Sequence, residues 1–308
     1  MKILCLDTNH PLLIETLLKN GFSIDEDYYS SYEEISSKIK DYDGIILRSR
    51  IPIDKSLINK ATKLKFIARV GAGMENIDTS FAIQKNIKLF NAPEGNRDSV
   101  AEHCIAMLLN LLHRIRIADN EVRNNVWKRA ENRGDELMGK TVGIYGYGTM
   151  GKAFAKRLSG FGVNVICYDI LQNIGDEFAE QVSEQILFEK SDVISIHVPL
   201  TDKTNQYFDA YFFQKFNKNI YFINTARGKC VNTTDLIHSI ESGKIKGACL
   251  DVLEFEQSSF EKIKTNEELE YLQQSDKVIL TPHIAGWSLQ SNEKMATIIA
   301  EKISTTFS

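Results

Sequence analysis

The sequence of 308 residues lacks any long run of apolar side chains. No segment approaches the roughly 18 apolar residues that a helix needs to cross a bilayer, so we expect no membrane partner. The apolar run at residues 3–6 is also too short for the hydrophobic region of a signal peptide. The expected location is therefore the cytoplasm.

Cysteine is scarce and follows no motif. The five cysteines are odd in number, widely spaced and set among apolar neighbours: Cys5, Cys104, Cys167, Cys230 and Cys249. A disulfide framework or a Cys-x-x-Cys metal site needs a different spacing. We predict reduced thiols in the core and no metal site.

The chain also lacks an excess of either charge. It has 37 basic and 41 acidic residues, a net charge of −4, and no block of five or more like charges. A surface that follows nucleic-acid phosphates needs clustered basic residues, so we expect no nucleic-acid partner. With 43% hydrophobic residues, the composition is that of a globular protein, and the length suggests two domains.

Short apolar runs alternate with helical patterns in the first hundred residues, which is typical of a parallel α/β unit. The expected strands are residues 2–6, 23–27, 44–47, 66–68 and 88–90, and the expected helices lie near residues 11–20, 31–40, 54–60 and 78–85. Residues 99–125 contain neither glycine nor proline and repeat apolar positions every three or four residues. They predict one long helix that could connect two domains.

A second alternation begins at Thr141 and contains six apolar strands separated by helices or loops, the pattern of a doubly wound sheet. Residues 288–307 are again helical and have no strand of their own, so we expect them to fold back onto the first domain. The predicted class is α/β, with two Rossmann-like domains built on parallel sheets.

The stretch "KTVGIYGYGTMGKAFAKRLSGFGVNVICYD" combines a strand, a glycine-rich turn, an amphipathic helix and a second strand. Gly146 permits a tight turn, Gly148 lets the backbone approach a pyrophosphate, and Gly151 lets the helix pack close to the strand. Thr149 and Met150 would supply backbone amides to the phosphates. This context favours a dinucleotide-binding turn over a turn that only packs a helix.

Asp169 ends the second of these strands. A carboxylate at that place accepts hydrogen bonds from the ribose hydroxyls and repels a 2′-phosphate, so the expected cofactor is NAD. The alternative is a carboxylate that only caps the strand end.

Other reactive side chains follow the apolar runs, where the carboxyl ends of the strands should meet. They are His197, Pro199 and Thr204 in "IHVPLTDKT", Arg227 in "INTARG", Asp251 and Glu256 in "CLDVLEFE", and His283 in "LTPHIAG". An imidazole such as His283 can take the hydroxyl proton of an alcohol that loses hydride, and Glu256 would orient that imidazole. Arg227 would bind a carboxylate by two hydrogen bonds. Taken singly, an arginine or a glutamate at a loop start is usually only surface charge, and the other histidines look structural.

The segments "RVGAGMENID", "NAPEGNRDSVAEH", "GKTVGIYGYGTMG", "HVPLT", "INTARGKCVN", "GACLDV" and "LTPHIAG" resemble the D-isomer-specific 2-hydroxyacid dehydrogenases, most closely the phosphoglycerate dehydrogenases. The resemblance implies a flavodoxin-like substrate-binding domain at residues 1–98 and 288–308 around an NAD-binding domain at residues 99–287. It also places Arg227, Glu256 and His283 at the catalytic positions.

The resemblance implies further contacts. The cofactor would be contacted by Pro199, Thr204, Thr225, Ala226, Asp251 and Gly286 in addition to the glycine turn, and the substrate by Arg48, Ser49, Ala72, Gly73 and Asn96. In these dehydrogenases the segment that corresponds to "VRNNVWKRAENR" lies at a dimer contact, and its second basic residue after the tryptophan approaches the neighbouring active site. That residue is Arg129 here, although solvated charge is the plainer interpretation.

Two departures from the family pattern qualify these expectations. A proline often follows the catalytic glutamate, but Gln257 follows Glu256 here, so Glu254 has to be considered as an alternative. The sequence ends at Ser308, which would leave no room for a carboxyl-terminal serine-sensing domain, and we expect no feedback inhibition by that route.

The expected function is NAD-dependent interconversion of a D-2-hydroxy acid and its 2-oxo acid, with 3-phospho-D-glycerate of serine biosynthesis as the leading substrate and a homodimer as the assembly. The alternatives are hydroxypyruvate or glyoxylate reductase, erythronate-4-phosphate dehydrogenase, and an NAD-gated binding protein.

Overall fold

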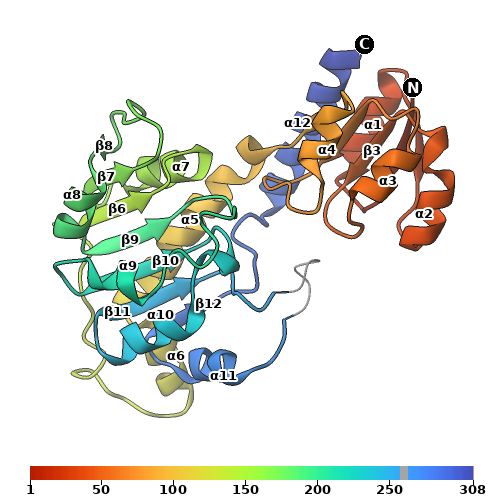
Figure 1. The fold of residues 1–308 in the computed structure, drawn as a ribbon. Coiled ribbons are helices and arrows are strands. Elements are labelled where there is room, and N and C mark those ends of the chain that lie inside the picture. The colour runs from red at the N-terminus through yellow and green to blue at the C-terminus, as the bar shows by residue number, and fades with distance from the viewer. Residues whose placement is uncertain (257–262, 308) are drawn as a thin grey trace. The chain divides into compact units, whose positions relative to one another are not determined.

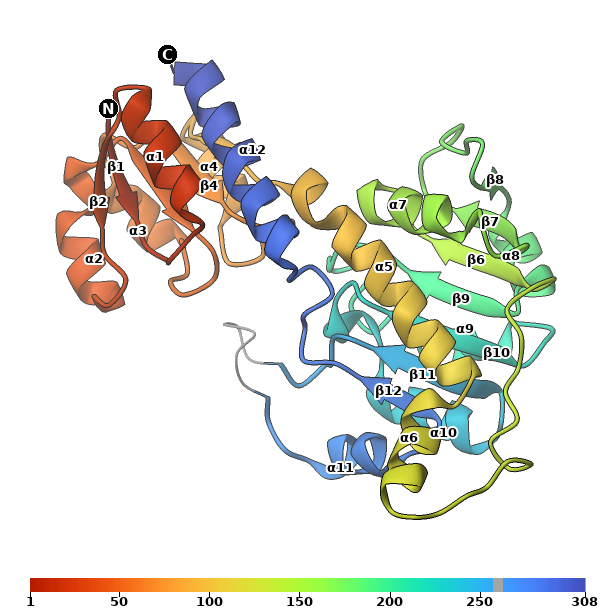
Figure 2. The same ribbon diagram turned by 180° about the vertical axis from the view of Figure 1, so that it is seen from behind.

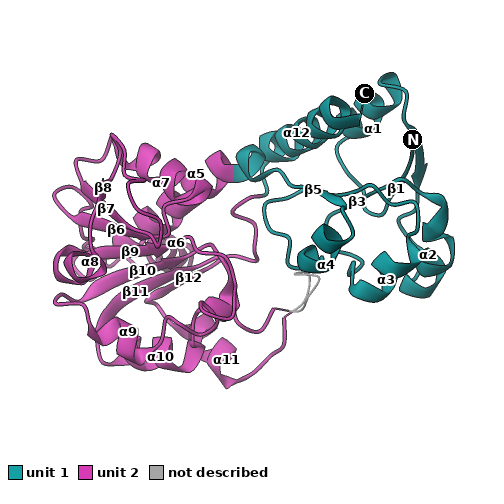
Figure 3. Ribbon diagram, turned by 45° about the horizontal axis from the view of Figure 1, so that its top comes forward, with its two compact units in different colours: residues 1–96, 258–260, 287–308 teal, residues 97–257, 261–286 magenta. Residues whose placement is uncertain are grey.

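The computed structural model describes residues 1–256 and 263–307 (Figure 1). These residues form two compact units (Figure 3). Unit 1 comprises residues 1–96 and 287–307, and unit 2 comprises residues 97–256 and 263–286. In the described parts of the chain, no helix is long and apolar enough to cross a membrane.

Unit 1 is built on a parallel sheet of five strands in the order β2-β1-β3-β4-β5. The strands are β1 (Lys2–Cys5), β2 (Ser23–Glu26), β3 (Gly44–Leu47), β4 (Phe66–Arg69) and β5 (Lys88–Phe90). The connecting helices are α1 (Pro11–Lys19), α2 (Tyr32–Lys38), η1 (Ile39–Asp41), α3 (Lys55–Lys60) and α4 (Thr79–Gln84). This is the flavodoxin-like strand order, and the sequence order reverses at the neighbouring strands β1 and β3.

The C-terminal helix α12 (Leu289–Phe307) returns to unit 1, as the sequence predicted. It packs beside α1 (Figure 2). The buried side chains Met295, Ile299 and Ile303 join Leu13 and Leu17 of α1 in one hydrophobic core. The helix therefore completes the apolar cover of one face of the sheet, because strands that are buried on both faces need a helical layer on each side.

Unit 2 contains a parallel sheet of seven strands in the order β12-β11-β10-β9-β6-β7-β8. Its strands are β6 (Thr141–Tyr145), β7 (Asn164–Tyr168), β8 (Glu180–Gln181), β9 (Val193–Ile196), β10 (Ile220–Asn224), β11 (Ile245–Leu250) and β12 (Val278–Leu280). Its other helices are α7 (Thr149–Leu158), α8 (Glu184–Lys190), α9 (Ala210–Gln214), η2 (Gly228–Cys230), α10 (Thr233–Glu241) and α11 (Glu267–Gln274). The six predicted strands are present, and the edge strand β8 adds a seventh that is too short to carry a periodic signal.

The prediction of one long helix over residues 99–125 was wrong. The structure has α5 (Pro93–Leu112) and then a separate α6 (Ile115–Arg123), because Arg114 adopts a left-handed conformation with φ 54°. The amide of Asp135 donates to the carbonyl oxygen of Leu112 at 2.9 Å, which satisfies a carbonyl at the end of α5. The break therefore depends on a partner about twenty residues further along the chain.

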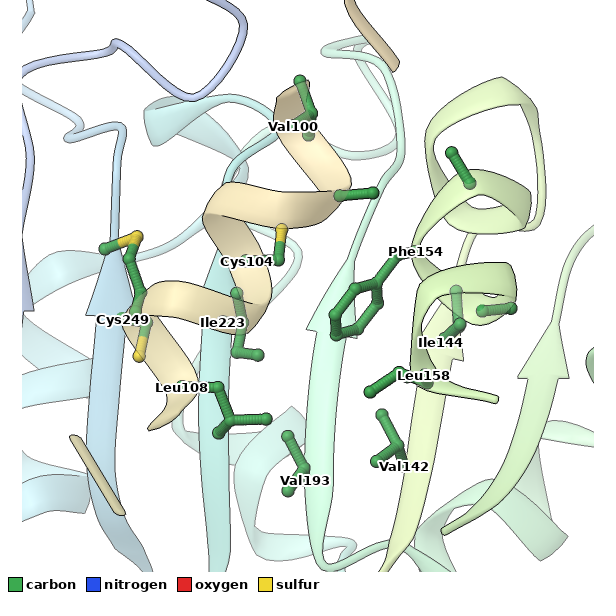
Figure 4. Packing of buried hydrophobic residues seen from close by; sticks show 14 of the residues in the cluster. Val100, Cys104, Leu108, Val142, Ile144, Phe154, Leu158, Val193, Ile223 and Cys249 are labelled. Atoms are coloured by element: carbon green, nitrogen blue, oxygen red, sulfur yellow. The ribbon is translucent and has the colours of Figure 1, made fainter. Parts of the chain in front are cut away.

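Helices α5 and α7 pack on the sheet of unit 2 through apolar side chains (Figure 4). Phe154 of α7 is fully buried in the same cluster as Leu108 of α5 and the strand residues Val142, Val193 and Ile223. This packing holds the first turn of α7 against the carboxyl end of β6, where the glycine-rich turn lies.

Candidate active site

Two glycines of the turn after β6 are required by packing. Gly146 has φ 95°, and a Cβ there would lie 3.0 Å from the backbone carbonyl of His197. A Cβ on Gly151 would lie 2.3 Å from the carbonyl oxygen of Gly146, so the helix can approach the turn only if this position is glycine. The sequence-based roles of these two residues thus have a steric cause.

Gly148 differs from both, because no heavy atom of the described residues outside its chain neighbours and its own helix lies within 4 Å of the place that its Cβ would take. It is the N-cap of α7, and no side chain caps the helix there. The first amides of a helix have no intrahelical acceptor and carry partial positive charge. The open approach and these amides, which include those of Thr149 and Met150, fit the pyrophosphate of a dinucleotide.

Asp169 follows β7, and two backbone amides hold its carboxylate. Tyr147 donates to one oxygen at 2.7 Å and Leu171 to the other at 3.0 Å. The carboxylate borders a cavity of about 670 Å³ within unit 2, lined by Tyr168, Asp169, Gln172, Asn173, Gly175, Gln181, Val182, Ser183 and Glu184. Its oxygens retain further lone pairs for ribose hydroxyl donors. A strand-end cap and a ribose acceptor are therefore compatible roles.

The segment after β9 forms a structured turn. The His197 imidazole Nε2 lies 2.8 Å from the Ser195 hydroxyl, and burial lowers the pKa of His197 to about 4, so the ring is neutral near pH 7. The Thr204 hydroxyl donates to the carbonyl oxygen of Pro199 at 2.7 Å. In this structure Thr204 thus stabilises the turn that carries Pro199.

The loops that carry Arg227, Glu256 and His283 all begin at the carboxyl ends of neighbouring strands. Strands β10, β11 and β12 are parallel neighbours, and their last residues Asn224, Leu250 and Leu280 are paired in register. Because parallel strands in register end together, the three loops begin side by side.

His283 and Glu256 are in direct contact. The imidazole Nδ1 lies 2.7 Å from Glu256 Oε2, and the second carboxylate oxygen accepts the amide of Leu253 at 2.5 Å. Glu254 instead accepts hydrogen bonds from Gln206 and Thr233. Of the two glutamates considered from the sequence, Glu256 is thus the one that contacts the imidazole.

Asp251 holds the turn of His283. Its buried carboxylate accepts the amides of Ile284 and Ala285, each at 2.9 Å, and the hydroxyl of Thr281 at 2.5 Å. Its carbonyl oxygen accepts the amide of His283 at 2.7 Å. Since His283 has φ 56°, a conformation that a side chain disfavours, these bonds are what keep the imidazole in place. The turn ends at Gly286, the last residue of unit 2.

Sequence reasoning missed this role of Asp251 and also the role of His103. The imidazole Nε2 of His103 lies 3.0 Å from the Thr281 hydroxyl and 3.6 Å from the Asp251 carboxylate. The only signal in the sequence was a histidine within a largely apolar helix, which is an ordinary feature of a core.

The loop of Arg227 is organised by hydrogen bonds between its own side chains and backbone. Asn224 accepts the amide of Ala226 at 2.9 Å, and Arg227 Nη1 donates to the carbonyl oxygen of Ala226 at 2.6 Å. The Thr225 hydroxyl lies 3.2 Å from the thiol of Cys104 in α5. These contacts fix the start of the loop that presents the guanidinium.

The residues assigned to the substrate in unit 1 lie after β3 and β4. Arg69 donates to the carbonyl oxygens of Arg48 and Gly73 at 2.8 and 2.7 Å, which joins the loop of Arg48 and Ser49 to that of Ala72 and Gly73. Two loops at the carboxyl ends of neighbouring strands are thereby connected.

Two further observations concern the same unit. The Arg48 guanidinium lies over the Trp287 indole, 4.2 Å from the ring centroid, a contact that the sequence did not predict. Asn96, in the first turns of α5, has a buried side-chain oxygen without a hydrogen-bond partner among the described residues. Such an acceptor normally has a donor, which a ligand can supply.

The chain matches the family model of the D-isomer specific 2-hydroxyacid dehydrogenase NAD binding domain over residues 105–285. It is 35% identical to a D-3-phosphoglycerate dehydrogenase of Archaeoglobus fulgidus over 98% of this chain and 56% of that protein. It is 34% identical to a hydroxypyruvate reductase of Thermotoga maritima over 88% of this chain and 87% of that protein. The crystal structure of a D-lactate dehydrogenase from Aquifex aeolicus with NAD and lactic acid superposes with a TM-score of 0.86, at 27% identity, over 99% of this chain and 95% of that one.

The chain therefore belongs to the D-isomer-specific 2-hydroxyacid dehydrogenase family and contains that family's NAD-binding domain. The expected fold class and the expected cofactor, NAD, are confirmed. The chain spans little more than half of the length of the Archaeoglobus phosphoglycerate dehydrogenase.

Gly148→Ala and Gly151→Ala should separate cofactor binding from folding. At Gly148 a methyl group meets open space, so we expect normal thermal stability but NADH binding weakened about tenfold or more, because the methyl group stands where the pyrophosphate approaches. At Gly151 the methyl group meets the Gly146 carbonyl, so both stability and binding should fall. Thermal unfolding and NADH fluorescence titration measure the two effects. Unchanged NADH affinity in Gly148→Ala would exclude this turn as the phosphate site.

Proposed function

We propose that the protein is an NAD-dependent oxidoreductase that interconverts a D-2-hydroxy acid and its 2-oxo acid. The observation that carries this proposal is the contact between His283 and Glu256 at the carboxyl ends of β11 and β12, next to the loop of Arg227. A proton-transferring imidazole, its carboxylate partner and a guanidinium are the groups that this chemistry needs.

The protein's own part in the reaction is proton transfer and charge stabilisation. During reduction, His283 donates a proton to the carbonyl oxygen of the oxo acid as hydride reaches the carbon, and during oxidation it accepts the hydroxyl proton. Glu256 orients the ring through Nδ1, which leaves Nε2 for the substrate. Arg227 binds the substrate carboxylate and the carbonyl oxygen on which negative charge develops.

The bound cofactor would supply the hydride chemistry, with NAD as the acceptor in oxidation and NADH as the donor in reduction. In the proposal the amides at the start of α7 and the turn of Gly146 and Gly148 would hold the pyrophosphate, and Asp169 would accept hydrogen bonds from the ribose hydroxyls. The nicotinamide end would be bordered by Pro199, Thr204, Thr225, Ala226, Asp251 and Gly286.

A panel of 2-oxo acids, with and without a phosphate group, tests the activity by NADH oxidation. We expect turnover with at least one of them, and a loss in kcat/KM of on the order of 10²-fold or more in His283→Ala and Arg227→Ala, with NADH affinity largely retained. His238→Ala, on helix α10, is the matched control and should behave like the wild type. Near-normal turnover in either active-site variant would contradict the proposed roles.

Asp169 should set the preference for NAD over NADP. Asp169→Asn keeps an acceptor for the amide of Tyr147 or Leu171 but removes the charge that repels a 2′-phosphate, so the ratio of kcat/KM for NADH to that for NADPH should fall about tenfold or more. The ratio is measured with one oxo acid at fixed concentration. If the wild type already uses both cofactors equally, the carboxylate does not determine the choice.

The leading substrate is 3-phospho-D-glycerate, with 3-phosphohydroxypyruvate as the oxo acid, which would place the enzyme in cytoplasmic serine biosynthesis. The relative named D-3-phosphoglycerate dehydrogenase and the positions of Arg48, Ser49 and Asn96 support this choice, with Ala72 and Gly73 supplying amides to the substrate carboxylate. Hydroxypyruvate or glyoxylate is the second candidate, supported by the hydroxypyruvate reductase that covers most of the chain. Erythronate 4-phosphate remains in the panel, and turnover of any small acid without a partner would exclude a purely NAD-gated binding protein.

We propose a two-fold homodimer as the active assembly. Helix α6 has no buried residue, and exposed apolar side chains lie on it and on the segment that follows it: Ile115, Val122, Trp127 and Met138. Large apolar side chains that are exposed along one stretch of chain are candidates for an interface. In such a dimer Arg129, which is exposed in the single chain, would join Arg48 of the partner around a substrate phosphate.

Arg129→Ala should raise KM for a phosphorylated oxo acid much more than for an unphosphorylated one, by about 1.5–3 kcal/mol for a charge-assisted contact. Lys128→Ala is the control, because the lysine is adjacent but pairs with Glu121 of its own chain at 3.4 Å. Steady-state kinetics with both substrates and sedimentation at micromolar concentration provide the measurements. A monomer, or equal effects on both substrates, would leave Arg129 as ordinary surface charge.

A further inference from the structure

The carboxylate of Glu254 connects three loops that begin at the carboxyl ends of neighbouring strands. One oxygen accepts the side-chain amide of Gln206 at 2.7 Å, and the other accepts the backbone amide and the hydroxyl of Thr233 at 3.1 and 2.9 Å. Gln206 belongs to the segment after β9, Thr233 begins α10 after the loop of β10, and Glu254 itself follows β11. Hydrogen bonds to an ionised carboxylate are stronger than those between neutral groups, so this is a firm connection.

The same loop is pressed against the turn of Arg227. A Cβ on Gly228 would lie 2.0 Å from the carbonyl carbon and oxygen of Leu253 and 2.6 Å from the amide nitrogen of Glu254. The backbone of Leu253 and Glu254 therefore lies in contact with the residue next to Arg227. A shift of either loop would move the other.

The backbone of Glu256 is tied to the same loop, because its amide donates to the carbonyl oxygen of Leu253 at 3.2 Å, and it also forms an antiparallel bridge with Ile263. The next residue is Gln257, so no proline ring limits the conformation of Glu256. Its carboxylate is held on one side by the amide of Leu253, one residue before Glu254, and on the other side by His283. The placement of Glu256 thus follows the placement of Leu253 and Glu254.

We infer that Glu254 is a positioning residue, which holds Glu256 against His283 and at a fixed distance from the loop of Arg227. It does not touch the reacting groups itself. This inference rests on the proposed function of the Glu256 and His283 pair, and it assigns to Glu254, the first glutamate of "LEFE", a role distinct from that of Glu256, the second.

The test compares Glu254→Gln, Thr233→Val and Thr233→Ser with Glu256→Gln. Glu254→Gln removes the charge, so the charge-assisted hydrogen bonds to Gln206 and Thr233 are replaced by weaker neutral ones and the connection is loosened. Thr233→Val removes one donor from Glu254 at nearly constant volume, and Thr233→Ser keeps that donor as the matched control.

The first readout is the pH titration of the His283 imidazole by NMR, which needs no turnover. Glu256→Gln should move the midpoint to lower pH, because the substitution removes a negative charge that lies 2.7 Å from Nδ1. Glu254→Gln should move it in the same direction by a smaller amount, Thr233→Val by less again, and Thr233→Ser should leave it unchanged. The other titratable groups near this turn, which are Asp251 after β11, His103 of α5 and Arg227 on the adjacent loop, are intact in all four variants.

The second readout is oxo acid reduction. We expect kcat to fall about 5–10-fold in Glu254→Gln, with its alkaline limb moved to lower pH and with unchanged KM for NADH. If Glu254→Gln unfolds, Thr233→Val carries the test. A His283 titration that responds to neither Glu254→Gln nor Thr233→Val, or a uniform loss of activity without a shifted pH profile, would overturn the inference.

The outcome distinguishes this inference from the proposed function. A wild type that reduces no 2-oxo acid of the panel contradicts the proposed function, yet the NMR titration still decides whether Glu254 positions Glu256. If Glu254→Gln shifts the titration and Glu256→Gln does not, Glu254 itself is the partner of His283, and both the inference and the assignment of Glu256 are wrong.

Discussion

The turn that carries His283 depends on the buried carboxylate of Asp251. A charge that is almost completely removed from water is tolerated only when hydrogen bonds compensate it, and here two consecutive amides and a threonine hydroxyl do so. Those bonds come from the turn that carries His283, whose backbone is left-handed. The cost of the buried charge and the cost of the unusual backbone are offset by the same contacts. The position of the imidazole therefore does not require a bound ligand.

Two glutamates in one short loop have identical side chains but different contacts, because their neighbours differ. Glu256 contacts an imidazole and can influence proton transfer, whereas Glu254 contacts an amide side chain and a helix start. The difference arises from the turn between them, which is fixed by the amide of Leu253 and by close packing on Gly228. Strands that end in register make this possible, because loops from β10, β11 and β12 then start near one another.

Overall sequence identity does not identify the acid on which the protein acts. The chain is 35% identical to a D-3-phosphoglycerate dehydrogenase and 34% identical to a hydroxypyruvate reductase, so overall identity does not distinguish these substrates. The contacting pair His283 and Glu256 belongs to unit 2, while Arg48 and its stacked partner Trp287 belong to unit 1. Stacking uses the face of the guanidinium and hydrogen bonds lie in its plane, so an arginine ordered by an indole can still bind an anion.

The amino-acid sequence by itself determined the two parallel α/β sheets, the return of the C-terminal helix, the glycine turn and the strand ends at which reactive side chains gather. These features follow from hydrophobic periodicity and from glycine sterics, which are local properties of the chain. Only the tertiary structure decided that α5 ends at Leu112, since the amide of Asp135 is its distant partner. It also decided that Glu256 rather than Glu254 meets His283, that Asp251 holds the turn, and that Trp287 stacks on Arg48. Periodicity reports which residues are buried, but it does not report which distant groups they meet, because that depends on how the strands are ordered and registered in the sheets.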